Sequence, residues 1–345
     1  MKLQDFDYHL PESLIAQAPL SDRDGSRMMV VDRASGTVTS RVFSDLPDYF
    51  DAGDVLVLNE SKVIPARLTA RKASGGTVEI LLLRDLTGPS PLPEWEVLLR
   101  PGKRVREGTA FFFSDGSQAK AVERVTAKKW VLRFNPREDL ETFVHREGQA
   151  PLPPYIKRKT GNGLRDLDLE RYQTVYARVP GSIAAPTAGL HFTGKTLERL
   201  DKKGVRTVPL TLHVGLGTFQ PLEADDVEDH RMESESYEIS GEGARIIETA
   251  RRVTAVGTTS TRVIETIFRN GGSPAPLKGN TSLFIYPGFR FRRVDRLVTN
   301  FHLPRSSLFL LVCAFAGRDL MFEAYGKAVA EGYRFYSYGD AMLIL

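Results

Sequence analysis

The pattern of apolar runs and turn residues changes near residues 63 and 155, and this change constrains the fold more than any other feature. Residues 63–134 form short apolar runs separated by Gly-Gly, Pro-Gly and Asp-Gly pairs, without helical periodicity. Several short strands with frequent turns are typical of a small sheet that closes on itself, or of a sandwich. A proline-rich segment follows at 151–154. We therefore predict an inserted, small, antiparallel β-barrel-like domain at residues 63–155.

The sequence on both sides of this insertion predicts a different domain. After residue 155, apolar runs of strand length alternate with runs of helix length, which favours a mainly parallel sheet with flanking helices. Thr193 and Ser240 are typical helix caps, and Gly204 can end the helix after Thr193. We predict a discontinuous α/β catalytic domain from residues 1–62 and 156–345. The predicted helices are 194–203, 242–252, 258–268, 308–317 and 321–331, and the predicted strands are 28–31, 55–58, 205–213, 255–257, 282–285, 297–301 and 341–344.

The composition limits the class of protein. The chain has 345 residues, 41% of them hydrophobic, so it can bury a sizeable core. Its most apolar run, 308–316, is too short to span a bilayer, and the first residues lack a signal-peptide run. Cys313 is the single cysteine, which excludes an intrachain disulfide and a Cys-based zinc site. We expect a cytoplasmic protein without a membrane partner, and a monomer because no heptad pattern is present.

The positive charge is concentrated in the inserted segment. The whole chain carries a formal net charge of +4, whereas residues 63–134 contain 13 Lys and Arg against 7 Asp and Glu. Charge asymmetry of this kind indicates a polyanionic partner such as a nucleic acid. A solvated sheet surface explains the same pattern. Arg100, Lys103 and Arg104 are the examples that we select as candidates for contact with such a polyanion.

Two long runs without regular periodicity are candidates for active-site loops. Residues 171–193 and 212–221 each place a His beside a Gly-Leu pair, and the first run carries enough aromatic and aliphatic residues to be ordered. His191, His213 and His302 all lie near a predicted strand end or helix start, where ligands gather in α/β sheets. No His pair has the helical spacing of a metal site, so no metal site is predicted.

Two short motifs allow more than one interpretation. Residues 189–196, GLHFTGKT, match the phosphate-loop pattern with Lys195 at its lysine, but no buried strand precedes them. A helix capped by Thr193, with a solvated Lys195, is the alternative. Residues 257–260, GTTS, follow a predicted strand and open a helix, where backbone amides can hold a carboxylate or phosphate. An ordinary capped helix explains that motif equally.

Longer strings resemble one family closely. RYQTVYA, PGS-AAPTAGLHFT, TLHVGLGTF, SLFIYPG, TNFHLP, AFAG and YGDAMLI, together with DFDYHLPESLIAQ, NESKVIPARL and GGTVEILLL, resemble the S-adenosylmethionine:tRNA ribosyltransferase-isomerase family of queuosine biosynthesis. The resemblance covers nearly the whole chain. Glu233 and Ser236 depart from the family pattern, in which a His and an aromatic residue are expected, and the segment around 161–169 is longer than usual.

The resemblance implies a reaction and its substrates. Such enzymes transfer and isomerise the ribosyl moiety of S-adenosylmethionine onto 7-aminomethyl-7-deazaguanine in a tRNA anticodon, and they release adenine and methionine. S-adenosylmethionine is then a consumed substrate, and no cofactor is expected. The competing hypotheses are a phosphate-loop nucleotide hydrolase and a non-catalytic RNA-binding protein.

The predicted site follows from this chemistry. A sulfonium acidifies the neighbouring ribosyl C–H, so a base can remove that proton, and a donor can assist the departure of adenine. His191, His213 and His302 are the candidates for these proton transfers. The methionine carboxylate is assigned to the amides near Thr258, with Arg262 or Arg178 nearby. The predicted substrate-binding residues are Thr187, Gly189, Gly215, Gly217, Phe219, Thr258, Thr259, Ser260, Arg262, Tyr286 and Arg178.

Overall fold

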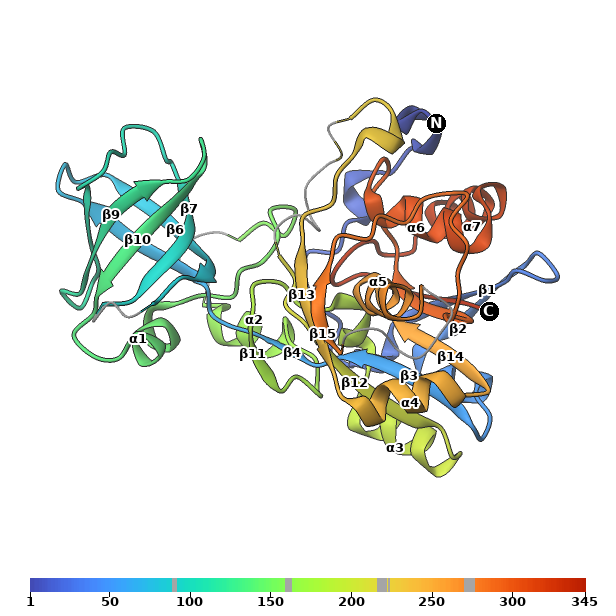
Figure 1. Ribbon diagram of the computed structural model, residues 1–345. Helices are drawn as coiled ribbons and strands as arrows, with labels where there is room; N and C mark the ends of the chain where they lie inside the picture. The colour runs from blue at the N-terminus through green and yellow to red at the C-terminus, as the bar shows by residue number, and fades with distance from the viewer. Residues whose placement is uncertain (89–91, 159–162, 216–221, 223, 270–276) are drawn as a thin grey trace. The chain divides into compact units, whose positions relative to one another are not determined.

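The chain forms two compact units (Figure 1). The computed structural model describes residues 1–88, 92–158, 163–215, 222, 224–269 and 277–345. The first unit comprises Met1–Lys62, Pro153–Arg158 and Gln173–Leu345, and the second comprises Val63–Leu152 and Lys159–Tyr172. The sequence did not predict that residues 159–172 belong with the inserted segment.

A nine-stranded sheet organises the first unit, in the order β15-β13-β12-β3-β14-β16-β17-β1-β2. The four central strands β12, β3, β14 and β16 are parallel to one another, and β17 is parallel to β1. The remaining neighbours pair antiparallel. The strands are β1 (Arg27–Asp32), β2 (Thr37–Val42), β3 (Asp54–Asn59), β12 (Arg206–Leu212), β13 (Glu235–Ile239), β14 (Arg252–Val256), β15 (Lys278–Thr281), β16 (Arg296–Asn300) and β17 (Ala341–Ile344).

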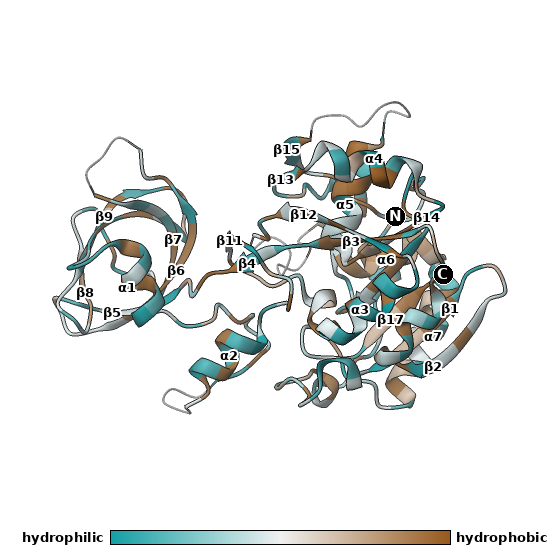
Figure 2. Cartoon of the chain, turned by 90° about the horizontal axis from the view of Figure 1, so that it is seen from below, coloured by the Kyte–Doolittle hydropathy of each residue, from teal (hydrophilic) through white to brown (hydrophobic). Residues whose placement is uncertain are grey.

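Helices cover both faces of this sheet, which confirms the predicted α/β fold. Alternate residues of β3 face opposite cores: Val55 and Val57 join one, and Leu56 and Leu58 join the other. A strand buried on both faces is a nearly continuous apolar run, as Figure 2 shows along β3. Residues of α4 (Gly241–Thr249), α5 (Thr258–Ile267), α6 (Ser307–Ala316) and α7 (Arg318–Ala330) line the first core, and residues of α3 (Gly194–Lys202) line the second.

The predicted helix caps are confirmed. The side chain of Thr193 accepts a hydrogen bond from the Thr196 N–H, and that of Ser240 accepts one from Gly243. Gly204, which follows α3, has a φ of 78° that favours glycine. The short 3₁₀ turns are η1 (Leu3–Phe6), η2 (Glu12–Leu14), η3 (Arg23–Gly25), η4 (Phe43–Tyr49), η5 (Thr187–His191) and η7 (Val227–Asp229).

The predicted strand at 282–285 is wrong. The edge strand β15 ends at Thr281, whose hydroxyl accepts a hydrogen bond from the Leu283 N–H and turns the chain. The Leu283 carbonyl then accepts from the Arg262 guanidinium instead of a neighbouring strand. Ile285 is apolar because it enters the core and not because it belongs to a sheet.

The second unit contains a closed, six-stranded antiparallel barrel, as predicted, in the order β10-β7-β6-β5-β8-β9. Inward residues such as Leu68, Ile80 and Leu132 are fully buried, and a register shift in β6 near Leu82 assists the curvature of closure. The barrel strands are β5 (Arg67–Lys72), β6 (Thr77–Asp85), β7 (Glu94–Arg100), β8 (Ala110–Phe112), β9 (Gln118–Arg124) and β10 (Lys129–Asn135).

The remaining elements are short. Helices α1 (Leu140–Glu147) and α2 (Arg165–Arg171) follow the barrel strands in sequence. β4 (Ser61–Val63) and β11 (Val179–Ser182) form a two-stranded sheet. Within the part of the chain that the structure describes, no helix has the length and apolar character needed to cross a bilayer.

A buried carboxylate joins the amino ends of three parallel strands. Asp54, the first residue of β3, is fully buried and accepts hydrogen bonds from Nε and Nη2 of Arg252 on β14, at 2.9 and 2.7 Å. Nη1 of Arg296 on β16 lies 3.8 Å from the same carboxylate. Removal of one partner of a buried ion pair leaves uncompensated charge and is strongly destabilising.

We predict that Asp54→Asn lowers the free energy of unfolding by about 3 kcal/mol or more, because two guanidinium groups then face a neutral amide. Urea denaturation measures the change. Arg251→Ala is the matched control, because Arg251 reaches Asp51 at 3.6 Å on the exposed surface and its loss should change stability by less than about 0.5 kcal/mol. Equal stabilities for Asp54→Asn and the unaltered protein would contradict the prediction.

Candidate active site

The loops that carry the predicted site residues leave the same edge of the sheet. Because β12, β3, β14 and β16 are parallel, their carboxyl ends at Leu212, Asn59, Val256 and Asn300 lie on one side. In open α/β sheets this edge is where ligands bind. Asn59 joins two of the ends, since its amide group donates to the Leu212 carbonyl at 2.9 Å and accepts from the Leu212 N–H at 3.1 Å.

A small cavity of about 40 Å³ lies at this edge. It brings together four predicted site residues: Thr187, Thr258, Thr259 and His302. The other lining residues are Ala185, Pro186, Ala188, Val214, Gly257, Thr299, Asn300 and Leu308. They come from η5 and the loop before it, from the carboxyl ends of β12, β14 and β16, and from the first turn of α6, so segments far apart in the sequence form one cavity.

The amino end of α5 borders the cavity. Gly257 precedes the helix with a φ of 87°, and no side chain caps the first turn. The first N–H groups of a helix lack partners within the helix, and the helix dipole favours an anion beside them. Ser260 in this turn is fully buried, and its hydroxyl oxygen has no hydrogen-bond partner. This arrangement suits a carboxylate or phosphate group.

His302 lines the cavity as a buried, neutral imidazole. Its Nε2 lies 2.8 Å from the Thr299 hydroxyl. Tyr325 and Tyr8 fix the backbone of His302, the first by accepting from its N–H at 3.1 Å and the second by donating to its carbonyl. Burial lowers the pKa of His302 to about 3. A neutral imidazole can both donate and accept one hydrogen bond.

His191 lies behind the cavity lining. Its Nδ1 is 2.8 Å from the Ser26 hydroxyl, and its Nε2 is 3.0 Å from Nδ2 of Asn300. Burial lowers the pKa of His191 to about 3, and the positive charges of Arg334 and Arg23 act in the same direction. Because both ring nitrogens are bonded within the protein, His191 acts on the cavity through Asn300.

His213 has the most accessible ring of the three histidines. It is half-buried, and its Nδ1 has no hydrogen-bond partner. The ring lies against Gly181, where an added Cβ would be 2.9 Å from Cε1 of His213. Burial lowers the pKa of His213. Its neighbour Val214 lines the cavity, so His213 belongs to the same group of loops.

Arg262 is engaged by the protein itself. Its guanidinium forms a buried ion pair with Glu235 and donates from Nε to the Leu283 carbonyl at 2.8 Å. The second carboxylate oxygen of Glu235 accepts from the Gly215 N–H at 3.1 Å. Arg262 therefore supports the loop at Gly215, and it does not line the cavity described above.

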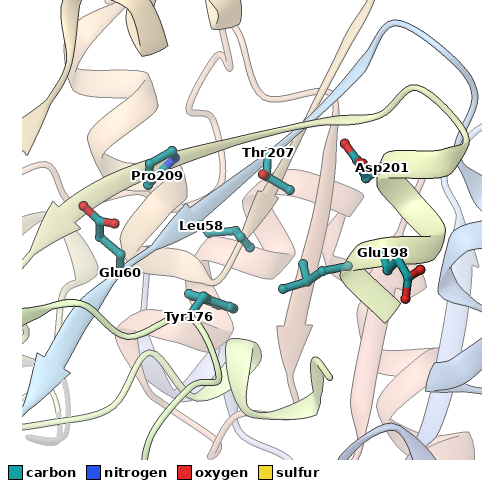
Figure 3. A pocket seen from close by; sticks show the side chains of 8 residues that line it. Leu58, Glu60, Tyr176, Glu198, Asp201, Thr207 and Pro209 are labelled. Atoms are coloured by element: carbon teal, nitrogen blue, oxygen red, sulfur yellow. The ribbon is translucent and has the colours of Figure 1, made fainter. Parts of the chain in front are cut away.

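Arg178 pairs with Glu60, a residue that lines a different hollow, shown in Figure 3. Two of its guanidinium nitrogens, Nε and Nη2, donate to the Glu60 carboxylate at 2.9 and 2.8 Å. Glu60, Glu198 and Asp201 line this hollow of about 370 Å³, together with Leu58, Tyr176, Leu197, Thr207 and Pro209. Arg178 does not line the smaller cavity, so the structure separates it from the amino end of α5.

The other predicted substrate-binding residues have different surroundings. Gly189 is buried in η5 close to Tyr176. Tyr286 packs on Phe284, with ring centroids 5.2 Å apart, and does not line the cavity. Gly217 and Phe219 lie outside the described residues.

The phosphate-loop interpretation of residues 189–196 does not fit the structure. A phosphate loop follows a buried strand, whereas the 3₁₀ turn η5 occupies Thr187–His191. Thr193 caps α3, and its hydroxyl also donates to Asp24 at 3.0 Å. Lys195 is exposed in the first turn, as the alternative interpretation predicts.

Arg100, Lys103 and Arg104 are exposed in the barrel unit. The acidic residues of neighbouring barrel strands already have partners: Glu79 pairs with Arg67, Glu94 with Arg133, and Glu96 with Arg84 and Lys129. Among the described residues, no ion pair involves the three candidate cations. Their charge is therefore available for an external anion.

The sequence analysis missed four polar residues that organise this site. Asn300 lines the cavity, Ser26 contacts His191, Glu235 holds the Gly215 loop, and Asn59 joins two strand ends. Asn300 occurs in the string TNFHLP at the end of a predicted strand, so its position was a usable signal. Ser26 lies far from the histidine loops in sequence and gave none.

Comparison with known proteins supports one family across the chain. The model of the queuosine biosynthesis protein family matches residues 3–344. The chain is 54% identical to the S-adenosylmethionine:tRNA ribosyltransferase-isomerase of Syntrophus aciditrophicus and 50% identical to that of Pelobacter propionicus, over 100% of each chain. A crystal structure of S-adenosylmethionine tRNA ribosyltransferase from Thermotoga maritima is 38% identical, with a TM-score of 0.54, covering 99% of this chain and 100% of that one.

We predict that Gly189→Ala destabilises the protein by about 1–3 kcal/mol, because the added Cβ would lie 2.0 Å from the Tyr176 hydroxyl and 2.8 Å from a Thr174 methyl. Urea denaturation measures the loss. Gly194→Ala is the control, since its Cβ meets nothing within 4 Å at the start of α3 and should be neutral or stabilising by up to about 1 kcal/mol. Similar effects of the two substitutions would show that the close approach at Gly189 is unimportant.

Proposed function

The chain belongs to the queuosine biosynthesis protein family, and from this premise we propose how its residues carry out the family's reaction. The protein is a tRNA-modifying transferase that moves and isomerises the ribosyl moiety of S-adenosylmethionine. The acceptor is 7-aminomethyl-7-deazaguanine in the tRNA anticodon, and the products are epoxyqueuosine-tRNA, adenine and methionine. S-adenosylmethionine is consumed, and we propose that no separate cofactor takes part.

One observation supports the small cavity as part of the reaction site. The strings that carry the family resemblance are far apart in sequence, yet Thr187, Val214 and His302 from three of them line the same cavity. The amino end of α5 borders it as well. We assign the methionine carboxylate to the amides of residues 258–260, which can hold an anion without a lysine or arginine.

The proton transfers need groups that are available to the substrate. A base must remove the ribosyl proton made acidic by the sulfonium, and His213 is the best candidate because its ring is partly exposed and its Nε2, unlike the buried Nδ1, is not enclosed by the protein. His302 lines the cavity and, as a neutral imidazole, can donate or accept a hydrogen bond with the part of the donor bound there. His191 is assigned a supporting role, since Ser26 and Asn300 engage its ring nitrogens.

The other predicted residues have narrower roles in this proposal. Gly189 and Gly215 shape loops at the site, and Arg262 stabilises the second of these through Glu235. Tyr286 and Phe219 remain candidates for contact with the sulfonium or adenine, Arg178 for contact with the methionine carboxylate, and Gly217 for contact with the substrate. We further propose that the protein is a cytoplasmic monomer, since its substrates are cytoplasmic and no second chain is needed for the residues named here.

The RNA contact is assigned to the barrel unit. Anticodon loops present unstacked bases, which an enzyme can reach without opening a duplex. The exposed cations Arg100, Lys103 and Arg104 can neutralise phosphates. The non-catalytic alternative, an RNA-binding protein that uses this module alone, leaves the cavity and its histidines without a role.

We predict that His213→Ala lowers the rate constant for adenine release by about 10²–10⁴-fold, the usual contribution of a positioned general base. The assay incubates the enzyme with S-adenosylmethionine and tRNA carrying the pre-queuosine base, and chromatography measures adenine. His9→Ala is the control because His9 is exposed, and its rate should be unchanged. An unimpaired His213→Ala variant would exclude His213 as the base. No adenine from the unaltered enzyme would refute the function itself.

We predict that reversing Arg100, Lys103 and Arg104 to Glu weakens tRNA binding and reduces the slope of log K against log salt by up to about 3, one for each phosphate that these cations no longer neutralise. Filter binding at several salt concentrations measures both quantities. Lys195→Glu is the control, since Lys195 is equally exposed but lies on α3. An unchanged slope in the triple variant would remove the barrel cations from the RNA-binding surface.

A further inference from the structure

The size of the small cavity restricts which part of the donor it can take. Its volume of about 40 Å³ suits a small polar group of the donor better than the whole nucleoside. The α-amino-carboxylate end of the methionine portion is of the right size, and it carries one negative and one positive charge.

The anion side of the cavity is the amino end of α5. Gly257, Thr258 and Thr259 line the cavity at this end, and the helix has ten residues without a side-chain cap at its start. Ser260, in the same turn, has a buried hydroxyl without a partner but does not itself line the cavity.

Asn300 supplies a hydrogen-bond acceptor, which suits a positively charged group. This residue is 3% exposed and lines the same cavity, and its side-chain oxygen Oδ1 has no hydrogen-bond partner. A buried acceptor without a partner costs about 1–3 kcal/mol, so a donor on the ligand would be favoured there. An ammonium group is such a donor, and it forms stronger hydrogen bonds than a neutral amine.

His191 and Ser26 determine which end of the Asn300 amide is left without a partner. Nδ2 of Asn300 donates to Nε2 of His191, at 3.0 Å. His191 must then carry its proton on Nδ1, which donates to the Ser26 hydroxyl at 2.8 Å. This chain of hydrogen bonds uses the amide nitrogen and leaves the oxygen for the ligand.

We propose that the cavity is the subsite for the zwitterionic α-amino acid end of S-adenosylmethionine, with the carboxylate on the α5 amides and the ammonium on Oδ1 of Asn300. His191 is a positioning residue that orients Asn300 and does not transfer a proton. The inference rests on the proposed function, since it names the part of the donor that this site recognises. It also implies that the enzyme discriminates against donors that lack either charge.

The test compares three donors: S-adenosylmethionine, its decarboxylated form, and an analogue with hydrogen in place of the α-ammonium. With the unaltered enzyme we expect each missing group to lower kcat/KM for adenine release, and the missing ammonium to lower it by about 10–100-fold. With Asn300→Leu, the preference for the ammonium should fall to within about threefold, while the preference for the carboxylate remains. Asn300→Asp retains an acceptor oxygen and should retain the ammonium preference.

The role of His191 is tested by rescue. His191→Gln places an amide oxygen near the position of Nε2 and can accept from Asn300, whereas His191→Leu cannot. We expect His191→Gln to keep the ammonium preference and His191→Leu to lose it mainly through KM. If both variants lower kcat equally and keep the preference, His191 is not a positioning residue for Asn300.

The failure of this inference is distinguishable from the failure of the function. If the unaltered enzyme releases adenine from S-adenosylmethionine but Asn300→Leu keeps the full ammonium preference, the subsite assignment is overturned and the function stands. Should Asn300→Leu not fold, product inhibition of the unaltered enzyme gives the answer. Methionine should then inhibit at least tenfold more strongly than 4-(methylthio)butanoate, which lacks the ammonium, and equal inhibition would overturn the assignment.

Discussion

The parallel pairing of β12, β3, β14 and β16 is the constraint on which the rest of the site depends. Parallel strands end on the same side, so loops from residues 59, 213, 257 and 301 meet although they are separated by more than 240 positions of the chain. Asp54 holds the amino ends of these strands through Arg252 and Arg296, and Asn59 holds two of the carboxyl ends. Both residues are buried polar groups at strand ends, and both are satisfied by hydrogen bonds there.

Helix α5 connects this framework to the cavity. Its amino end borders the cavity, while Arg262, one turn later, reaches Glu235 and through it the Gly215 loop. Glu265 on the same helix is fully buried and accepts from the backbone N–H groups of residues 292, 293 and 294, at 2.7, 3.1 and 2.9 Å. One helix therefore fixes one border of the cavity and two loops, so the cavity is held by contacts that lie well outside it.

Sequence patterns predicted the elements that are determined by residues close together in the chain. The caps at Thr193 and Ser240, the buried β3 and the barrel strands were all visible as residue patterns. The edge strand β15 was not, because its sequence KGNT is polar and its pairing with β13 is set by tertiary structure. At the site, Thr258 and His302 were predicted from their positions at strand ends. The roles of Arg262 and His191 were not predictable, since they depend on Glu235, Ser26 and Asn300, which only the fold brings to them.

The chemistry of a sulfonium explains why a cavity of this character is useful. A carboxylate beside the sulfonium would neutralise the positive charge that acidifies the neighbouring C–H and makes the thioether a leaving group. Among the described residues that line the cavity, none has a carboxylate, and His302 is neutral because burial lowers its pKa to about 3. Helix amides and the Asn300 oxygen can hold the amino acid end by dipoles without a neighbouring ion. The acidic residues Glu60, Glu198 and Asp201 line a different hollow, so under the proposed assignment they lie outside the cavity that takes the amino acid end.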